Sequence, residues 1–94
     1  MIRDFNDNDM DALLGIWLDA SIQAHGFIPQ EFWESKVADM RELYIPNSDV
    51  YVYEEHGTVN GFVALHGNTV EALFVSPGSQ GRGIGSQLLA KAKQ

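Results

Sequence analysis

The sequence predicts one α+β domain, in which an antiparallel sheet is flanked by helices in the order β-α-α-β-β-β-α. Apolar residues recur at helical spacing over residues 10–44 and then alternate with a period of two over residues 50–75. The connections within the period-two region are only a few residues long, so neighbouring strands must be antiparallel, because parallel neighbours need a long crossover. Ninety-four residues, 45% of them hydrophobic, are enough for one folded core.

The N-terminal half is expected to hold a short strand over residues 1–5 and then two helices. Asp7, Asn8 and Asp9 are candidate N-caps for the first helix. Its buried stripe is predicted to contain Met10, Leu13, Leu14, Trp17, Leu18 and Ser21. The segment from His25 to Ile28 interrupts the pattern, and a second helix is predicted to begin at Pro29. The buried stripe of this second helix is predicted to contain Trp33, Val37, Met40 and Tyr44.

Three strands are expected over residues 50–54, 59–66 and 69–75. The turns between them contain Glu55-His56-Gly57 and Gly67-Asn68, which are residue types that tight hairpins favour. A final helix is predicted from Ser86 onward, with Leu88, Leu89 and Ala92 on its apolar face.

Composition narrows the class of partner. The formal charge of −7 disfavours nucleic acid, because binding to phosphate backbones relies on Lys and Arg patches. The same charge would attract a cationic amine, although an acidic balance also serves solubility alone. There is no Cys, and the three His residues are isolated in the sequence, so no metal site is expected. Neither a signal peptide nor a membrane span is predicted, which makes a cytoplasmic protein the default expectation.

The most informative stretch is Gln80-Gly81-Arg82-Gly83-Ile84-Gly85, which lies between the last predicted strand and the final helix. A glycine-rich turn that opens into a helix presents free backbone N–H groups to an anion, and the helix dipole adds positive potential there. Glycine also lets the backbone come close to the ligand and adopt positive φ. We interpret this stretch as a diphosphate-binding loop, with a glycine-rich turn that binds nothing as the alternative.

Two familiar phosphate loops do not fit the spacing. The loop of nucleotide hydrolases needs Lys followed by Ser or Thr after its last glycine, whereas Gly85 is followed by Ser86 and Gln87. The dinucleotide fingerprint needs G-x-G-x-x-G within a parallel βαβ unit, whereas this chain has G-x-G-x-G after antiparallel strands. The pattern that remains is Gln-x-x-Gly-x-Gly, carried by Gln80, Gly83 and Gly85.

That spacing, after a strand ending in Phe74-Val75-Ser76-Pro77, resembles the acetyl-CoA-binding motif of the GNAT superfamily of N-acetyltransferases. The order of elements resembles the first two thirds of that fold, most closely that of the small stand-alone bacterial enzymes. Homologous folds continue with a fifth strand, a helix and a closing hairpin, so residues 1–94 are expected to be the N-terminal portion of such a domain. The chain would then be a fragment, a natural truncation, or completed by a second copy.

The missing fifth strand would leave the Thr69–Val75 edge uncovered, and an apolar edge favours association. We therefore expect a homodimer, or self-association at that edge.

The resemblance implies transfer of acetyl from acetyl-CoA to a primary amine by direct attack in a ternary complex, without a metal. Gly83 and Gly85, with the N–H groups of Gly81, Arg82, Ile84 and Ser86, would hold the diphosphate. Gln80 and Arg82 would position the loop or face a phosphate. Backbone groups of Leu73, Phe74 and Val75 would pair with the pantetheine amides and polarise the acetyl carbonyl.

Two side chains are candidates for catalysis. Glu71, on the same strand, could act as a general base on the amine, or it could be an ordinary exposed strand carboxylate. His25, in the loop between the helices, could bind or deprotonate the amine, and Phe27 could line its pocket; both could equally be packing residues. No residue corresponds to the Tyr general acid that many family members place after the fifth strand. The alternatives are a non-catalytic acyl-CoA-binding or dimerisation module, and a structural dimer whose loop binds nothing.

Overall fold

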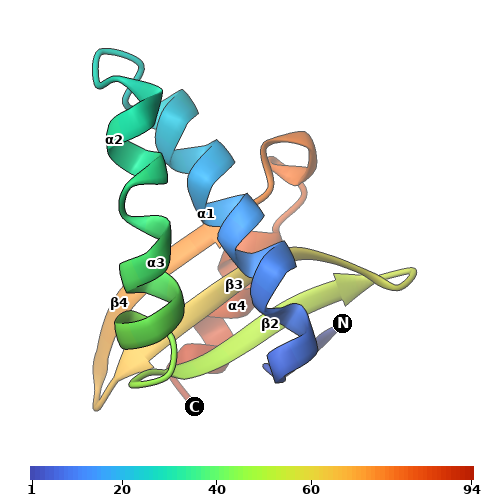
Figure 1. Cartoon of the computed structure of the whole chain (residues 1–94). Coiled ribbons are helices and arrows are strands. Elements are labelled where there is room, and N and C mark those ends of the chain that lie inside the picture. The colour runs from blue at the N-terminus through green and yellow to red at the C-terminus, as the bar shows by residue number, and fades with distance from the viewer.

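Four antiparallel strands form one sheet in the order β1-β2-β3-β4, with helices on both faces (Figure 1). The computed structural model describes all residues from 1 to 94. The strands are β1 (Ile2–Asp4), β2 (Asp49–Glu55), β3 (Thr58–His66) and β4 (Thr69–Val75). The helices are α1 (Met10–Ala24), α2 (Gln30–Glu34), α3 (Val37–Asp39) and α4 (Ile84–Ala92). Single turns complete the chain: η1 (Asp7–Asp9), the π-turn η2 (Met40–Tyr44) and η3 (Pro77–Ser79). The predicted fold class is confirmed, and the order of the strands and of the first and last helices is as predicted.

The two hairpin turns lie at the turn residues predicted from the sequence. His56 and Gly57 have φ of +53° and +78°, so both central residues of the β2–β3 turn are left-handed, as a type I′ turn requires. Gly67 opens the β3–β4 turn with φ of +62°. The three strands of this meander lie within one residue of their predicted bounds, and β4 has the predicted bounds.

Each face of the sheet has its own apolar core. In Figure 1, α1, α2 and α3 lie in front of the sheet and α4 lies behind it. Phe62 of β3 points to the front cluster with Leu13 of α1, whereas its neighbour Val63 points to the rear cluster with Leu88 of α4. All four side chains are fully buried. β3, one of the two central strands, therefore contributes fully buried side chains to both layers.

Gly61 sets how closely α4 approaches the sheet. A Cβ at this position would lie 3.1 Å from the Leu88 Cδ1 atom, 3.1 Å from the Phe74 carbonyl oxygen and 3.3 Å from the Ile84 Cγ2 atom. These distances are tighter than ordinary van der Waals contact. The absence of a side chain here lets the first turn of α4 pack directly against β3, beside the end of β4.

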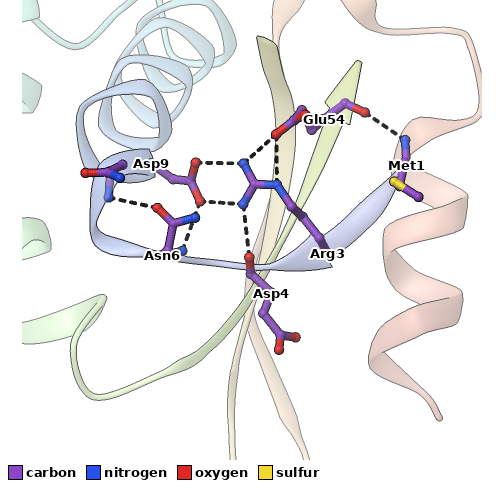
Figure 2. A network of polar contacts seen from close by, with 7 residues as sticks. Met1, Arg3, Asp4, Asn6, Asp9 and Glu54 are labelled. Atoms are coloured by element: carbon purple, nitrogen blue, oxygen red, sulfur yellow. Dashed lines mark hydrogen bonds and ion pairs between the residues drawn. The ribbon is translucent and has the colours of Figure 1, made fainter. Parts of the chain in front are cut away.

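The start of α1 is held to the sheet by a polar network around Arg3 (Figure 2). The two terminal nitrogens of Arg3 donate to both carboxylate oxygens of Asp9, at 2.8 and 2.9 Å. The Nε and Nη2 atoms of Arg3 also donate to Glu54 Oε1, at 2.8 and 2.6 Å. Asp9 is buried, and the hydrogen bonds from Arg3 hold its pKa below the usual value. The network joins β1, β2 and the first turn of the helix layer.

Asp9, one of the predicted N-caps, occupies the N-cap position of α1, but its side chain makes no cap hydrogen bond to that helix. Asn6 caps the preceding turn η1: its side chain accepts from the Asn8 amide at 2.9 Å, while Asp9 accepts from the Asn6 amide at 2.9 Å. This is a capping box, in which two otherwise unpaired donors are satisfied reciprocally.

The prediction of one continuous second helix from Pro29 is wrong. Pro29 precedes α2, and the segment is divided into α2, α3 and η2. The Ser35 hydroxyl donates to the Phe32 carbonyl at 2.6 Å, which offers the backbone an alternative to the helical ladder. Farther along, the Ile45 amide donates to the Met40 carbonyl, five residues back, so the last turn is a π-turn. Tyr44, predicted to be buried, is 62% exposed as a result.

Candidate functional site

The loop between β4 and α4 carries a run of unpaired backbone donors. Gly81 and Gly83 have φ of +84° and +82°, a conformation that side chains rarely adopt. The amides from Gly81 to Ser86 donate to no protein acceptor, and the first bond of the helix runs from the Gln87 amide to the Gly83 carbonyl at 3.1 Å. Six consecutive free N–H groups at the start of α4 form an arrangement that favours an anion.

Two side chains hold this loop in place. The Gln80 Nε2 atom donates to the Val75 carbonyl at 3.2 Å, which ties the loop to the end of β4. Arg82 reaches β2, where its Nη2 atom donates to both carboxylate oxygens of Glu55, at 2.8 and 2.7 Å. This contact lowers the pKa of Glu55 and raises the pKa of Arg82. Of the two roles predicted for Arg82, the geometry favours positioning of the loop.

β4 is an edge strand, and alternate residues present their main chain to the open side. The Ser76 amide donates to the Asn60 carbonyl at 2.7 Å. Because bonded pairs alternate along an antiparallel ladder, Phe74 turns its main chain toward β3, whereas Leu73 and Val75 turn theirs to the open edge. Of the three residues predicted to offer main-chain groups to the ligand, Leu73 and Val75 therefore face the open edge, and Phe74 does not.

Glu71 lies in a β-bulge. Ala64 pairs with Ala72, but the next residue of β3, Leu65, pairs with Val70, which leaves Glu71 without a partner. A bulge bends the strand and redirects side chains. On a regular strand Glu71 and Ala72 would point to opposite faces, but here both line the same cavity.

That cavity has a volume of about 570 Å³ and lies between α1, η2 and the strands β3 and β4. Eight of its twelve lining residues are hydrophobic, including Trp17 of α1, Tyr44 of η2 and Phe74 of β4. His66 and Glu71 are among its polar lining residues. The cavity can therefore enclose an apolar group and offer a carboxylate to a polar one.

The other predicted acceptor residues lie apart from this cavity. The His25 ring stacks on Trp33, with centroids 5.4 Å apart, and meets Phe27 edge-on at 6.1 Å. Neither His25 nor Phe27 lines the cavity, and Phe27 is 84% exposed. The structure does not bring His25 and Glu71 into one site.

Sequence reasoning missed the wall formed by η2. Tyr44 is predicted in a buried helix stripe, and His66 is the last residue of the strand predicted over residues 59–66, yet both line the cavity. No local signal marks them, because they are 22 residues apart and meet only through the π-turn and the β3–β4 pairing.

No three His, Asp or Glu side chains gather closely enough to hold a metal ion. None of the helices combines the length and the apolar character that crossing a bilayer requires.

An open strand edge that leads into unpaired amides defines a domain that can hold an elongated ligand with a phosphate-bearing end. Residues 46–94 match the family model described as acetyltransferase (GNAT) domain. The chain belongs to this family, and the resemblance noted from its loop is confirmed.

Two curated relatives are peptidyl-lysine N-acetyltransferases of Escherichia coli strain K12. YiaC is 34% identical over 95 residues, which is all of this chain and 65% of YiaC. YjaB is 27% identical over 92 residues, which is 97% of this chain and 62% of YjaB. The chain thus spans slightly less than two thirds of the length of these relatives.

Solved structures share the fold. The apo-form solution structure of YjaB from Escherichia coli has a TM-score of 0.80 at 29% identity, covering 98% of this chain and 63% of YjaB. The PaiA N-acetyltransferase of Thermoplasma acidophilum, solved with coenzyme A, has a TM-score of 0.80 at 18% identity, covering 99% of this chain and 69% of that one. The structure is therefore a partial GNAT fold.

Proposed function

We propose that this domain serves an N-acetyltransferase that moves an acetyl group from acetyl-CoA to a primary amine by direct attack in a ternary complex. The observation that carries this proposal is the run of six unpaired amides from Gly81 to Ser86, placed where an open strand edge ends. The names of the curated relatives specify peptidyl-lysine, so the ε-amine of a protein lysine is the first acceptor to test.

The diphosphate of the coenzyme would lie against the free amides of the loop. Charge-assisted hydrogen bonds from backbone N–H groups are short and strong, and the positive end of the α4 dipole adds to them. Gly81 and Gly83 give the loop its left-handed turns, and no protein atom stands within 4 Å of where a Cβ would project from either. The anion therefore has an open approach to the backbone.

The pantetheine arm would extend along β4 from this loop. Leu73 and Val75 present main-chain groups to the open edge, so the arm could pair with them as an added strand does. The Val75 carbonyl already accepts a bond from Gln80, which leaves the Val75 amide and both main-chain groups of Leu73 for the ligand. One of these amides would polarise the acetyl carbonyl.

Glu71 is our candidate general base. Attack requires a neutral amine, so the nitrogen must lose a proton as its bond to the acetyl carbon forms and the carbon–sulfur bond breaks. The carboxylate would take that proton directly or through a water, and the leaving thiolate would take one from solvent. Positioning of the two substrates would supply much of the rate.

The test combines coenzyme binding with turnover. Titration of coenzyme A by calorimetry and by ¹H–¹⁵N NMR should shift the amide signals of residues 81–86 and saturate. Acetyl transfer to a lysine peptide should then be followed by mass spectrometry. Binding without turnover would support an acyl-CoA-binding module instead, and the absence of binding would reject the proposal.

A second proposal concerns the open edge of β4. Val70 and Leu73 are 38% and 36% exposed there, and an unpaired apolar edge can join a second copy. We expect this chain to self-associate at high concentration in sedimentation equilibrium, and Leu73→Lys to abolish the association. Coenzyme A should dissociate the dimer, because it would occupy the same edge; a monomer at all concentrations would reject the idea.

The cytoplasmic location and the absence of a nucleic-acid partner stay predictions from the sequence.

A further inference from the structure

Arg82 is the only cationic side chain in the glycine-rich loop, and it is already engaged. Its Nη2 atom donates to both carboxylate oxygens of Glu55, at 2.8 and 2.7 Å. Glu55 lies at the end of β2, and the sheet order places β3 between β2 and β4. Because neighbouring strands lie about 4.7–4.9 Å apart, the strand that holds Arg82 is roughly 10 Å from the β4 edge. The arginine therefore extends toward the interior strands and not toward the open edge.

The carboxylate of Glu55 is also held from its own side of this contact. Glu55 pairs with Thr58 across the tight turn between β2 and β3. Its Oε1 atom accepts a further bond from the Asn60 Nδ2 atom, at 3.4 Å. The side chain of Glu55 is 27% exposed, against 50% for that of Arg82. Glu55 is thus the more enclosed partner, so Arg82 is the one that would have to move to reach a ligand.

No other Lys or Arg is available near the loop. The chain has six of these side chains, and four of the remaining five contact a carboxylate or an aromatic ring: Arg3, Lys36, Arg41 and Lys91. The fifth, Lys93, is the C-cap of α4, so the nine residues of that helix separate it from the loop. At 1.5 Å per residue this separation is about 13 Å. A second phosphate beside the loop would therefore meet no free Lys or Arg of residues 1–94.

Coenzyme A carries a phosphate of this kind, a monoester on the ribose 3′ oxygen, besides the diphosphate that the loop amides would hold. A phosphate monoester bears about 1.5–2 negative charges near pH 7, so reading it requires donors or a cation of its own. We propose that Glu55 is a specificity-determining residue: by holding Arg82, it leaves residues 1–94 unable to read the 3′-phosphate, and dephospho-coenzyme A is as good a ligand as coenzyme A. This inference rests on the proposed function, because it concerns the same loop.

The test compares two ligands that differ only in this phosphate. Calorimetry at low salt and at pH 8, where histidine is neutral, should give Kd values for coenzyme A and dephospho-coenzyme A that agree within about twofold. Both ligands should shift the same amide signals of residues 81–86 in ¹H–¹⁵N NMR. Adenosine 3′-monophosphate, which offers the monoester without the diphosphate, should leave these signals unchanged. A preference of about fivefold or more for coenzyme A would overturn the proposal.

Three variants assign the effect to Glu55. Glu55→Gln should create a preference for coenzyme A over dephospho-coenzyme A of about two- to fivefold, the scale of an exposed ion pair, because Arg82 is then free to meet the 3′-phosphate. Adding Arg82→Gln should make the two Kd values equal again, which separates the released arginine from the mere loss of a negative charge. Glu54→Gln is the matched control, since it removes the same charge one residue away but releases Arg3 instead of Arg82.

The outcomes separate this inference from the proposed function. If neither coenzyme shifts the signals of residues 81–86, the loop holds no diphosphate, and both proposals fail. If both coenzymes bind and the parent chain clearly prefers coenzyme A, only this inference is rejected. Equal binding in the parent that stays equal in Glu55→Gln would overturn the role of Glu55. The comparison in the parent needs no variant, so it decides the first point even where a substitution disturbs folding, which thermal unfolding would reveal.

Discussion

Replacing Gly83 by alanine tests whether the loop binds the coenzyme diphosphate, and it adds only one methyl group. Gly83 has φ of +82°, and a left-handed conformation costs a residue with a Cβ about 1–2 kcal/mol. No protein atom lies within 4 Å of the new methyl group, so no clash adds to this cost. A domain of this size loses about 4–8 °C in Tm for each kcal/mol, and thermal unfolding should show such a loss while the chain stays folded at 25 °C.

The effect on coenzyme binding should exceed the effect on stability. Relief of the strain would rotate the peptide that joins Gly83 to Ile84 and turn the Ile84 amide away from the diphosphate. Loss of one hydrogen bond to a charged group costs about 1.5–3 kcal/mol, and about 1.4 kcal/mol is a factor of ten. We expect calorimetry to show at least a tenfold rise in the Kd for coenzyme A.

The chain contains a matched control for this strain. Gly57, in the β2–β3 turn, has φ of +78° and equally open surroundings, so Gly57→Ala should cost similar stability without changing coenzyme affinity. Gly85→Ala should not lower the stability of the fold, because the new Cβ would lie at an ordinary 3.6 Å from Val75 Cγ2. Alanine is also the better helix former by about 0.5–1 kcal/mol. Equal coenzyme affinity in Gly83→Ala and Gly57→Ala would refute the diphosphate assignment.

The remaining predictions concern charge and packing. Asp9→Asn should lower the free energy of unfolding by about 1.5–3 kcal/mol in urea titration. Arg3 lowers the pKa of Asp9 in the folded state. The stabilisation by the Arg3–Asp9 pair is therefore present above the unfolded pKa of 3.8 and is lost as the pH falls through the lower pKa of the folded state. An Asp9→Asn variant with the same acid sensitivity as the parent would contradict this. Glu55→Gln should tighten coenzyme A binding about two- to fivefold at low salt, since it removes a negative charge and frees Arg82; weaker binding would mean that the pair is needed to shape the loop. Gly61→Ala should cost about 1–3 kcal/mol by overpacking α4, and an unchanged Tm would show that α4 can shift freely.

The sheet could be predicted because its signals are local. Alternation with a period of two marks each strand, and residues such as His56-Gly57 mark the turn between two of them. The short turns then dictate antiparallel order without any knowledge of the core. The glycine loop was also a local signal, because its spacing excluded two competing phosphate motifs, and the pattern that remained resembles the acetyl-CoA-binding motif of the GNAT superfamily.

The division of the second helix could not be predicted, since its causes do not disturb the apolar period. Trp33 and Val37 still pack against the front core, as a continuous helix would place them. At the break the Ser35 hydroxyl donates to the Phe32 carbonyl, and at the π-turn the Ile45 amide bonds one residue farther back than in an α-helix. Neither feature has a distinctive sequence pattern.

The candidate site also combines a feature with a local sequence signal and a feature without one. The glycine loop proposed to hold the coenzyme is a local motif, whereas the unpaired position of Glu71 depends on a register shift opposite Ala64 and Leu65. A register shift is a property of two paired strands, so the alternation within one strand cannot reveal it. The pairing of Arg82 with Glu55 joins residues 27 positions apart and was likewise invisible.

The pairing of Arg82 changes how an acidic protein can hold an anionic coenzyme. The chain carries a formal charge of −7, and its loop arginine is already engaged by Glu55. The attraction must then come from neutral donors, namely the six free amides and the dipole of α4, which act within the first turn of the helix. The opposing net charge acts over longer distances, where salt at physiological strength screens it beyond about 8 Å. Oriented peptide groups can therefore bind a diphosphate at short range despite the negative net charge of the domain.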